Sequence, residues 1–316
     1  MKPRPWCRGS GWTVVWISCA ATILAVAGCT TTLRDEEAQP TTTSTLPNPP
    51  GIATFDGIAA GDCLTWPDDQ PDSIKTVSCN DAHRFEVASV VDLSTLPGSE
   101  FGPDAPPPSQ ARIQQISIEQ CQPAAQQYLG THYDPTSRFT ISLLWAGKVA
   151  WELGDERRVF CGLQLQGVDD ARSRFTGRVA DLDQSKVWPP GTCLGIDPAG
   201  IPTDLPVSCA GPHSMEVTGS VNVGEQFPGG LPSEAEQDAF TKDRCTASTD
   251  AYLAPVQLRS TTLTVVYSTI GEPSWTAGSR QVACRIGAVT GDGAWSTLLN
   301  SAKGDLLIDG QPPAPR

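Results

Sequence analysis

Two stretches of sequence decide the fold of this chain. Residues 61–87 read GDCLTWPDDQPDSIKTVSCNDAHRFEV, and residues 191–217 read GTCLGIDPAGIPTDLPVSCAGPHSMEV. Both contain Gly-x-Cys-Leu, then Val-Ser-Cys, then a histidine followed three residues later by Glu-Val. They align without a gap at the offset that separates Cys63 from Cys193, and self-similarity at a fixed offset is typical of a repeated structural unit.

The match continues beyond these stretches with a shorter offset, because residues are missing near the Pro-rich loop at 97–108, where a deletion costs little. This order of matches predicts a duplication, and the equivalent tryptophans are expected to pack in the core. The further pairs are Cys121 and Cys245, Tyr128-Leu129 and Tyr252-Leu253, Trp151 and Trp275, and Cys161 and Cys284.

The N-terminus reads as an export signal. Lys2, Arg4 and Arg8 precede an apolar run at 13–27 that is short for a membrane-spanning helix. The sequence Val-Ala-Gly-Cys ending at Cys29 resembles the lipobox of bacterial lipoproteins, which implies cleavage before Cys29 and a lipid on its sulfur. We therefore expect an extracytoplasmic protein, anchored to the cell membrane by palmitate-type acyl chains on Cys29. The alternative is an uncleaved membrane helix that ends at this cysteine.

These signals divide the chain into five segments. A lipoprotein signal peptide is predicted at 1–28, and a Thr/Pro-rich tether at 29–54, where the composition cannot bury a core. The first repeat is expected at 55–178 and the second at 179–303. A flexible tail is expected at 304–316.

Eight of the 11 cysteines lie at equivalent positions of the repeats, four in each. In an exported chain, four cysteines in a unit predict two disulfides, for which three pairings are open. A zinc site made of four cysteines is a further alternative, although the usual CxxC spacing is absent. We favour pairs that staple a turn-rich segment of equal length in both copies and that tie a helix to the last strand: Cys63–Cys79, Cys121–Cys161, Cys193–Cys209 and Cys245–Cys284.

Each repeat is predicted to have an α+β fold of order β-β-β-α-β-β, with a mainly antiparallel sheet. Pro123 is expected to kink the first helix or to begin a new one, and Ser233 with Glu236 predicts a capping box for the second helix. Helices are expected at 109–129 and 233–253, and strands at 85–93, 139–145, 158–165, 215–223, 263–268 and 280–289.

The repeated motif is similar to the septum formation domain of actinobacterial envelope proteins. The resemblance rests on Gly61, Cys63, Leu64, Cys79, His83 and Glu86-Val87, and on Gly191, Cys193, Leu194, Cys209, His213 and Glu216-Val217. It implies a process, septum formation in cell division or envelope maintenance, rather than a reaction. Many members carry a transmembrane helix, whereas this chain is expected to be lipid-anchored.

The charge and the motifs exclude several function classes. A formal net charge of −13 excludes a nucleic-acid-coating domain, which needs a basic stripe. The chain has no P-loop, GxSxG elbow, HExxH or GxGxxG, so no catalytic residue, cofactor or metal ligand is assigned.

The equivalent histidines, His83 and His213, with Glu86 and Glu216, form the one candidate motif. Strand positions i and i+3 point to opposite faces, so each pair is expected to stay apart unless a turn intervenes. The histidines are expected to pack beside the disulfide turns and to bond to backbone.

The sequence therefore favours a non-enzymatic, lipid-anchored binding or scaffolding protein of the cell envelope. Its expected partners are the membrane, through the lipid, and division or cell-wall proteins. Two alternatives stay open. One is a cell-wall hydrolase with a His/carboxylate site, and the other is a solute- or lipid-binding lipoprotein.

Overall fold

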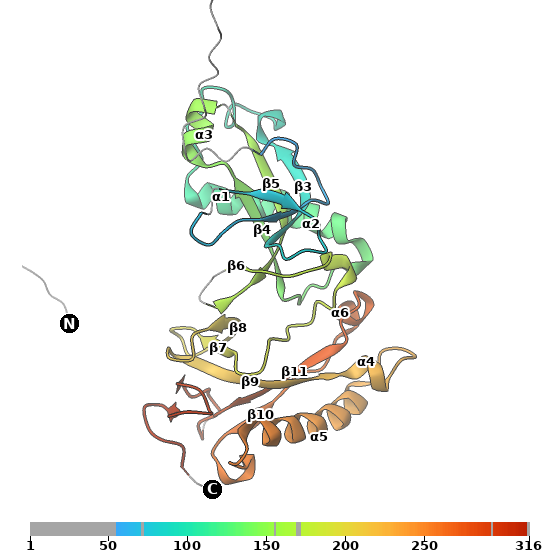
Figure 1. Ribbon diagram of the computed structural model, residues 1–316, viewed down its shortest axis with the longest axis vertical. Helices are drawn as coiled ribbons and strands as arrows, with labels where there is room; N and C mark the ends of the chain where they lie inside the picture. The colour runs from blue at the N-terminus through green and yellow to red at the C-terminus, as the bar shows by residue number, and fades with distance from the viewer. Residues whose placement is uncertain (1–54, 71–72, 155, 169–171, 292, 315–316) are drawn as a thin grey trace, which may run out of the picture. The chain divides into compact units, whose positions relative to one another are not determined.

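The computed structural model describes residues 55–314, except 71–72, 155, 169–171 and 292. The predicted signal peptide and the whole predicted tether, including Cys29, lie outside the described residues. Two antiparallel sheets follow one another along the chain (Figure 1). We call residues 55–182 the first half and residues 183–314 the second half.

The first half forms a six-stranded sheet of order β2-β1-β3-β5-β4, with β6 paired to β5. Every pair in it is antiparallel. The predicted strand at 139–145 is confirmed as β4, which is uncharged and lies at one edge. The strands are β1 (Cys63–Thr65), β2 (Lys75–Val77), β3 (Phe85–Asp92), β4 (Phe139–Trp145), β5 (Arg158–Gln166) and β6 (Arg172–Ser173).

The second half forms a seven-stranded sheet of order β10-β11-β9-β12-β13, in which β7 pairs with β9 and β8. Its pairs are antiparallel as well. The strands are β7 (Cys193–Ile196), β8 (Pro202–Val207), β9 (His213–Asn222), β10 (Thr264–Val266), β11 (Gln281–Gly287), β12 (Leu298–Leu299) and β13 (Leu307–Ile308).

Among the described residues, helices are present in both predicted ranges, 109–129 and 233–253, and three further short helices, α3, α4 and α6, were not predicted. Pro123 lies in the first turn of α2, where its missing N–H leaves no bond unmade, and a π-helical stretch, Ser117–Cys121, precedes it. The capping box of Ser233 and Glu236 opens the second-half helix as predicted. The helices are α1 (Gln110–Ile116), α2 (Gln122–Leu129), α3 (Gly147–Gly154), α4 (Val223–Gln226), α5 (Glu234–Leu253) and α6 (Glu272–Thr276).

Four disulfides join the pairs that the spacing favoured. Their Cα–Cα distances, 4.7 to 5.2 Å, are ordinary for such bridges. In each half one bridge staples the first two strands and the other ties the long helix to a central strand. The pairs are Cys63–Cys79, Cys121–Cys161, Cys193–Cys209 and Cys245–Cys284.

The equivalent tryptophans pack in the core, as expected. Trp151 of α3 and Trp275 of α6 are 2% and 9% exposed. The guanidinium group of Arg157 lies 4.1 Å from the centre of the Trp151 ring, and that of Arg280 lies 3.9 Å from the Trp275 ring. Both tryptophans therefore serve packing and a cation–π contact rather than an exposed stacking surface.

Residues in two of the predicted segments pack against the sheets. Val179, placed at the start of the second repeat, is fully buried and packs with Ala125 and Leu163 of the first half. The tail predicted from residue 304 contains the buried Leu306 and strand β13, which pairs with β12. Apolar side chains in these segments pull the backbone onto the sheets, although short loops surround them.

A buried carboxylate links the two halves. Asp134, 2% exposed, accepts hydrogen bonds from the backbone N–H and the hydroxyl of Thr136 in its own half. It also accepts hydrogen bonds from the hydroxyls of Ser274, at 2.8 Å, and Ser279, at 2.5 Å, in the second half. These bonds compensate for the desolvation of the charge, so the contact is a satisfied polar junction.

Candidate functional site

A β-bulge brings the histidine and the glutamate of the second-half motif together. The register of β9 against β7 shifts beside Gly195, and Ser214 stands as the extra residue. The bulge cancels one step of the strand alternation, so His213 and Glu216 lie on the same side. The expectation that these residues stay apart is therefore wrong, because the alternation is interrupted between them.

The same arrangement recurs in the first half. Arg84 stands at the position of the extra residue, and its N–H donates to the carbonyl of Leu64 at 2.9 Å. His83, Glu86 and Cys63 each bring one potential ligand atom, and these atoms lie within 4.8 Å of one another. Cys193, His213 and Glu216 do so in the second half.

The cysteine of each cluster is held in a disulfide. Cys63 is bonded to Cys79 and Cys193 to Cys209, so neither sulfur is a thiolate. A thiolate is the form in which cysteine binds a metal or attacks a substrate. As they stand, the clusters therefore offer a histidine and a glutamate beside a disulfide, which fits a metal ion poorly.

Both oxygens of each glutamate already accept hydrogen bonds. Glu86, fully buried, accepts from the Tyr128 hydroxyl at 2.7 Å and from the backbone N–H of Val179 at 2.7 Å. Two strong donors on a buried carboxylate compensate for the loss of its hydration.

The equivalent carboxylate in the second half has the same kinds of partner. Glu216 accepts from the hydroxyls of Tyr252 and Ser301, the latter at 2.8 Å, and from the backbone N–H of Ala302 at 2.6 Å. In both halves the carboxylate thus fastens the last segment of the half to the core of the sheet.

Burial keeps both tyrosines protonated. Burial, and then the hydrogen bond to the Glu86 carboxylate, raise the pKa of Tyr128 to about 12. The same two causes raise the pKa of Tyr252 well above its usual value. Both phenols are therefore neutral donors at physiological pH rather than acid–base groups.

Each histidine bonds to the turn that precedes it, as expected. Nδ1 of His83 lies 2.8 Å from the carbonyl of Asp81, and Nδ1 of His213 lies 2.9 Å from the carbonyl of Gly211. A carbonyl only accepts, so Nδ1 carries the proton and Nε2 is left as an acceptor. Within the part of the chain that the structure describes, neither Nε2 has a hydrogen-bond partner.

Burial holds the second-half histidine neutral. It lowers the pKa of His213, with the carbonyl of Gly211 and the charge of Glu216 acting in the opposite direction. His83 packs against the ring of Phe175, whose centroid lies 4.1 Å away. These groups support a hydrogen-bonded core rather than an exposed reactive site.

Sequence reasoning missed the segment that closes each cluster. Residues 175–179 and 298–302 make the same contacts: Phe175 and Leu298 pair with the histidines, and Val179 and Ala302 donate to the glutamates. The two segments share no residue identity, so the repeated motifs of the sequence do not extend to them. Only the tyrosines, already matched as Tyr-Leu pairs, were detectable.

No helix among the described residues is both long enough and apolar enough to cross a membrane. Cys29 lies outside these residues, so its lipid stays a prediction.

Comparisons with known proteins agree with the resemblance seen in the sequence. A family model described as septum formation matches residues 60–284. Two relatives from different strains of Mycobacterium tuberculosis, each called an uncharacterized membrane protein, are 61% identical over 264 residues, which is 83% of this chain. The chain spans 59% of the length of these curated relatives. No solved structure matches it.

Proposed function

The chain belongs to the septum formation family, and from that premise we propose that it acts in septum formation as a non-enzymatic binding or scaffolding protein of the cell envelope. The observation that carries the proposal is the state of the recurring motif. Both carboxylate oxygens of Glu86 and of Glu216 accept hydrogen bonds from other parts of the fold.

A catalytic role needs an acid–base group that reaches a substrate. His83, Glu86, His213 and Glu216 are all fully buried. Tyrosine hydroxyls and backbone N–H groups occupy the glutamates, and the neighbouring sulfurs are tied in disulfides. This arrangement supports a rigid scaffold that presents surfaces, which is what a binding protein requires.

We further propose that the chain carries two septum formation domains in tandem. The support is the recurrence of the motif, the disulfides and the glutamate contacts in both sheets. The hydrogen bonds from Val179 to Glu86 and from Ala302 to Glu216 support domain ends that lie beyond Val179 in the first half and beyond Ala302 in the second.

The proposed anchor is a lipid on Cys29, which would hold the domains outside the cytoplasm. Its support is the lipobox-like sequence at 26–29 and the name membrane protein carried by the relatives. Mass spectrometry of the N-terminal peptide tests it, because a diacylated Cys29 has a defined mass increment. The same peptide should be unmodified in the Cys29→Ala variant, and an unmodified peptide in both would overturn the anchor.

Localisation and crosslinking in dividing cells test the functional proposal. A tagged full chain is expected to concentrate at mid-cell and to crosslink to division or cell-wall proteins. The purified chain is expected to leave labelled peptidoglycan intact. Turnover of that polymer, lost when His83 and His213 are replaced by Asn, would overturn the proposal in favour of a hydrolase. A lipid or solute that co-purifies in stoichiometric amount would favour a carrier instead.

A further inference from the structure

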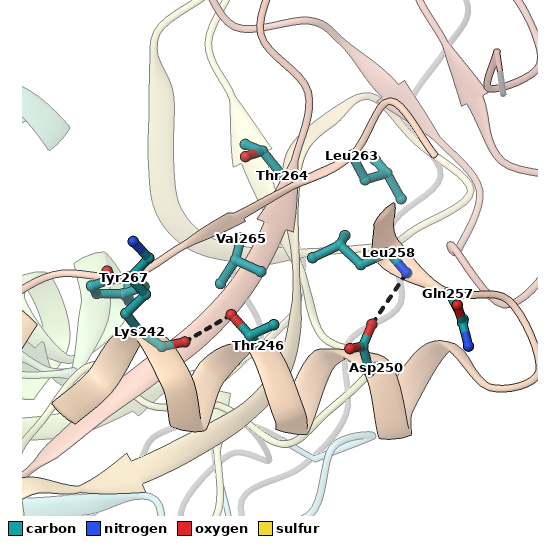
Figure 2. A pocket seen from close by; sticks show the side chains of 9 residues that line it. All are labelled: Lys242, Thr246, Asp250, Gln257, Leu258, Leu263, Thr264, Val265 and Tyr267. Atoms are coloured by element: carbon teal, nitrogen blue, oxygen red, sulfur yellow. Dashed lines mark hydrogen bonds between the residues drawn. The ribbon is translucent and has the colours of Figure 1, made fainter. Parts of the chain in front are cut away.

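A groove runs between α5 and the edge strand β10 (Figure 2). Its volume is about 530 Å³, within the range of ligand and peptide sites. The helix supplies one wall, and the strand with the preceding turn supplies the other. The lining residues are Lys242, Thr246, Asp250, Gln257, Leu258, Leu263, Thr264, Val265 and Tyr267.

The spacing of these residues follows from the two elements. Lys242, Thr246 and Asp250 lie one helical turn apart and share one side of α5. Asp250 closes one end of the groove by accepting a hydrogen bond from the backbone N–H of Leu258 at 3.2 Å, as Figure 2 shows. The groove therefore has a fixed end as well as fixed walls.

The strand beside the groove is an unprotected edge. β10 is the last strand of its sheet, and the sequence around it, residues 263–268, reads LTVVYS. Natural sheets usually guard such edges with Lys, Pro or a bulge, because a free row of N–H and C=O groups templates the pairing of another strand. None of these guards is present in this stretch.

A second groove lies at the equivalent place in the first half, between the α2 helix region and the edge strand β4. Its volume is about 310 Å³. Seven of its lining residues are the counterparts of residues in the first groove, at the offset that relates Cys121 to Cys245. They are Ile118, Gln122, Tyr133, Asp134, Phe139, Thr140 and Ile141.

In each half a disulfide holds the helix beside the edge strand. Cys245 of α5 is bonded to Cys284 of β11, the strand next to β10, and Cys121 is bonded to Cys161 of β5, next to β4. A groove with covalently fixed walls binds an extended chain at a low entropic cost, because little must be ordered on binding.

The charged side chains of α5 favour one kind of binding partner for the groove over another. The exposed charged side chains of α5 are five acids and two bases, of which Asp250 and Lys242 line the groove, and Tyr267 of the groove donates to the carboxylate of Asp238 at 2.9 Å. A second copy of this chain would place like charges against each other, whereas a basic segment would be attracted. The acids are Glu234, Glu236, Asp238, Asp243 and Asp250, and the bases are Lys242 and Arg244.

We propose that the groove between α5 and β10 binds an extended segment of a partner protein whose groove-facing side carries both apolar and basic residues. The segment pairs with the free edge of β10, sets its apolar side chains against Leu258 and Val265, and directs its basic side chains to Asp238 and Asp250. The proposal rests on the binding function above and names the surface that performs it.

Fluorescence anisotropy with three labelled nonapeptides and the full chain tests the proposal. In all three peptides every second residue is Thr, and the residues between are Val and Lys in turn, Val and Glu in turn, or Gly and Lys in turn. Both kinds of side chain therefore share one face of the extended peptide. The Val/Lys peptide is expected to bind at least tenfold more tightly than either comparator. It is also expected to slow amide hydrogen exchange in residues 263–267.

Two variants locate the site. Val265→Lys places a charge in the groove and is expected to weaken binding at least tenfold, whereas Val149→Lys, at a valine 52% exposed on α3, is expected to leave it unchanged. Asp250→Asn removes the negative charge but keeps an oxygen that can accept the hydrogen bond from the backbone N–H of Leu258. This variant is therefore expected to fold normally. It is expected to weaken binding severalfold, and Asp69→Asn is its matched control.

Several results would contradict the proposal that the groove binds this segment. They are equal binding of the three peptides, equal effects of Val265→Lys and Val149→Lys, or unchanged exchange in β10. A concentration-dependent dimer that Val265→Lys dissolves would identify a second copy as the occupant. In one further outcome, the peptides fail to bind the groove while the Val265→Lys variant still crosslinks to division proteins in cells. In that case the proposed binding function stands, and it uses another surface of the chain.

Discussion

The backbone N–H of Val179 donates a hydrogen bond to the buried carboxylate of Glu86, 93 residues earlier in the chain, at 2.7 Å. Ala302 makes the same bond to Glu216 at 2.6 Å, 86 residues apart. In each half a charged side chain thus fixes the last segment to the first long strand. The glutamates are therefore expected to contribute to stability rather than to turnover.

Replacement of Glu86 by Gln tests this role. The Gln amide keeps one oxygen, but its NH2 group faces one of the two donors, so one buried hydrogen bond is lost. The free energy of unfolding is expected to fall by about 1–3 kcal/mol, measured by urea denaturation. Glu152→Gln, at an exposed position of α3, is expected to change it by less than about 0.5 kcal/mol. Equal effects of the two variants would contradict a structural role.

The pH dependence of stability is expected to report on His213. Burial lowers its pKa below the unfolded value of about 6.5. The unfolded state therefore binds the extra proton first, so the stability that the neutral ring contributes is present above that pH and is lost as the pH falls below it.

His213→Asn keeps a donor for the carbonyl of Gly211 but cannot titrate. Urea midpoints between pH 7.5 and pH 5 are expected to fall more steeply for the natural chain than for this variant. Parallel midpoints would show that the histidine does not control the acid sensitivity.

Removal of the longer-loop disulfide is expected to lower the free energy of unfolding more than removal of the shorter-loop disulfide. In the chain-entropy treatment, the bridge over 16 residues, Cys63–Cys79, contributes about 3 kcal/mol, and the bridge over 40 residues, Cys121–Cys161, contributes about 4 kcal/mol. Paired Cys→Ser variants, compared by urea denaturation, should follow that order. A larger loss from the shorter loop would show that native packing, rather than loop closure, sets the cost.

Gly177 is expected to resist replacement, because it turns the segment that ends at Val179. Its φ is +89°, and a Cβ there would lie 3.1 Å from Leu182. Gly177→Ala is expected to lower the melting temperature through a loss of about 1 kcal/mol or more. Gly102→Ala, where φ lies outside the left-handed region, is the matched control and should be close to neutral. A loss of similar size in both would contradict a specific need for glycine at position 177.

Much of the fold could be predicted because the same motifs occur twice in the sequence, so that each signal could be read in two places. Cysteine spacing favoured the pairs Cys63–Cys79 and Cys121–Cys161, and β-branched runs located β3 and β4. The capping box at Ser233 fixed the start of α5. These features depend on local residue types, so they are readable without tertiary contacts.

The candidate site was less readable. The bulge at Ser214 depends on the register of β9 against β7, which local sequence does not encode. Segments 175–179 and 298–302 bind the glutamates through the backbone N–H groups of Val179 and Ala302. Almost every residue type has such an N–H group, so the sequence does not reveal these contacts. The packing of Val179 and of Leu306 could not be predicted for the same reason.

The central claim is that this chain serves septum formation by binding, with its histidine–glutamate motifs as internal supports. Fluorescence of a tagged full chain in dividing cells tests it most directly, comparing the natural sequence with the double variant His83→Asn, His213→Asn. The account predicts enrichment at the septum in both, at equal protein amounts. A uniform envelope signal from the natural chain would contradict the account, and so would loss of septal enrichment in a double variant that accumulates normally.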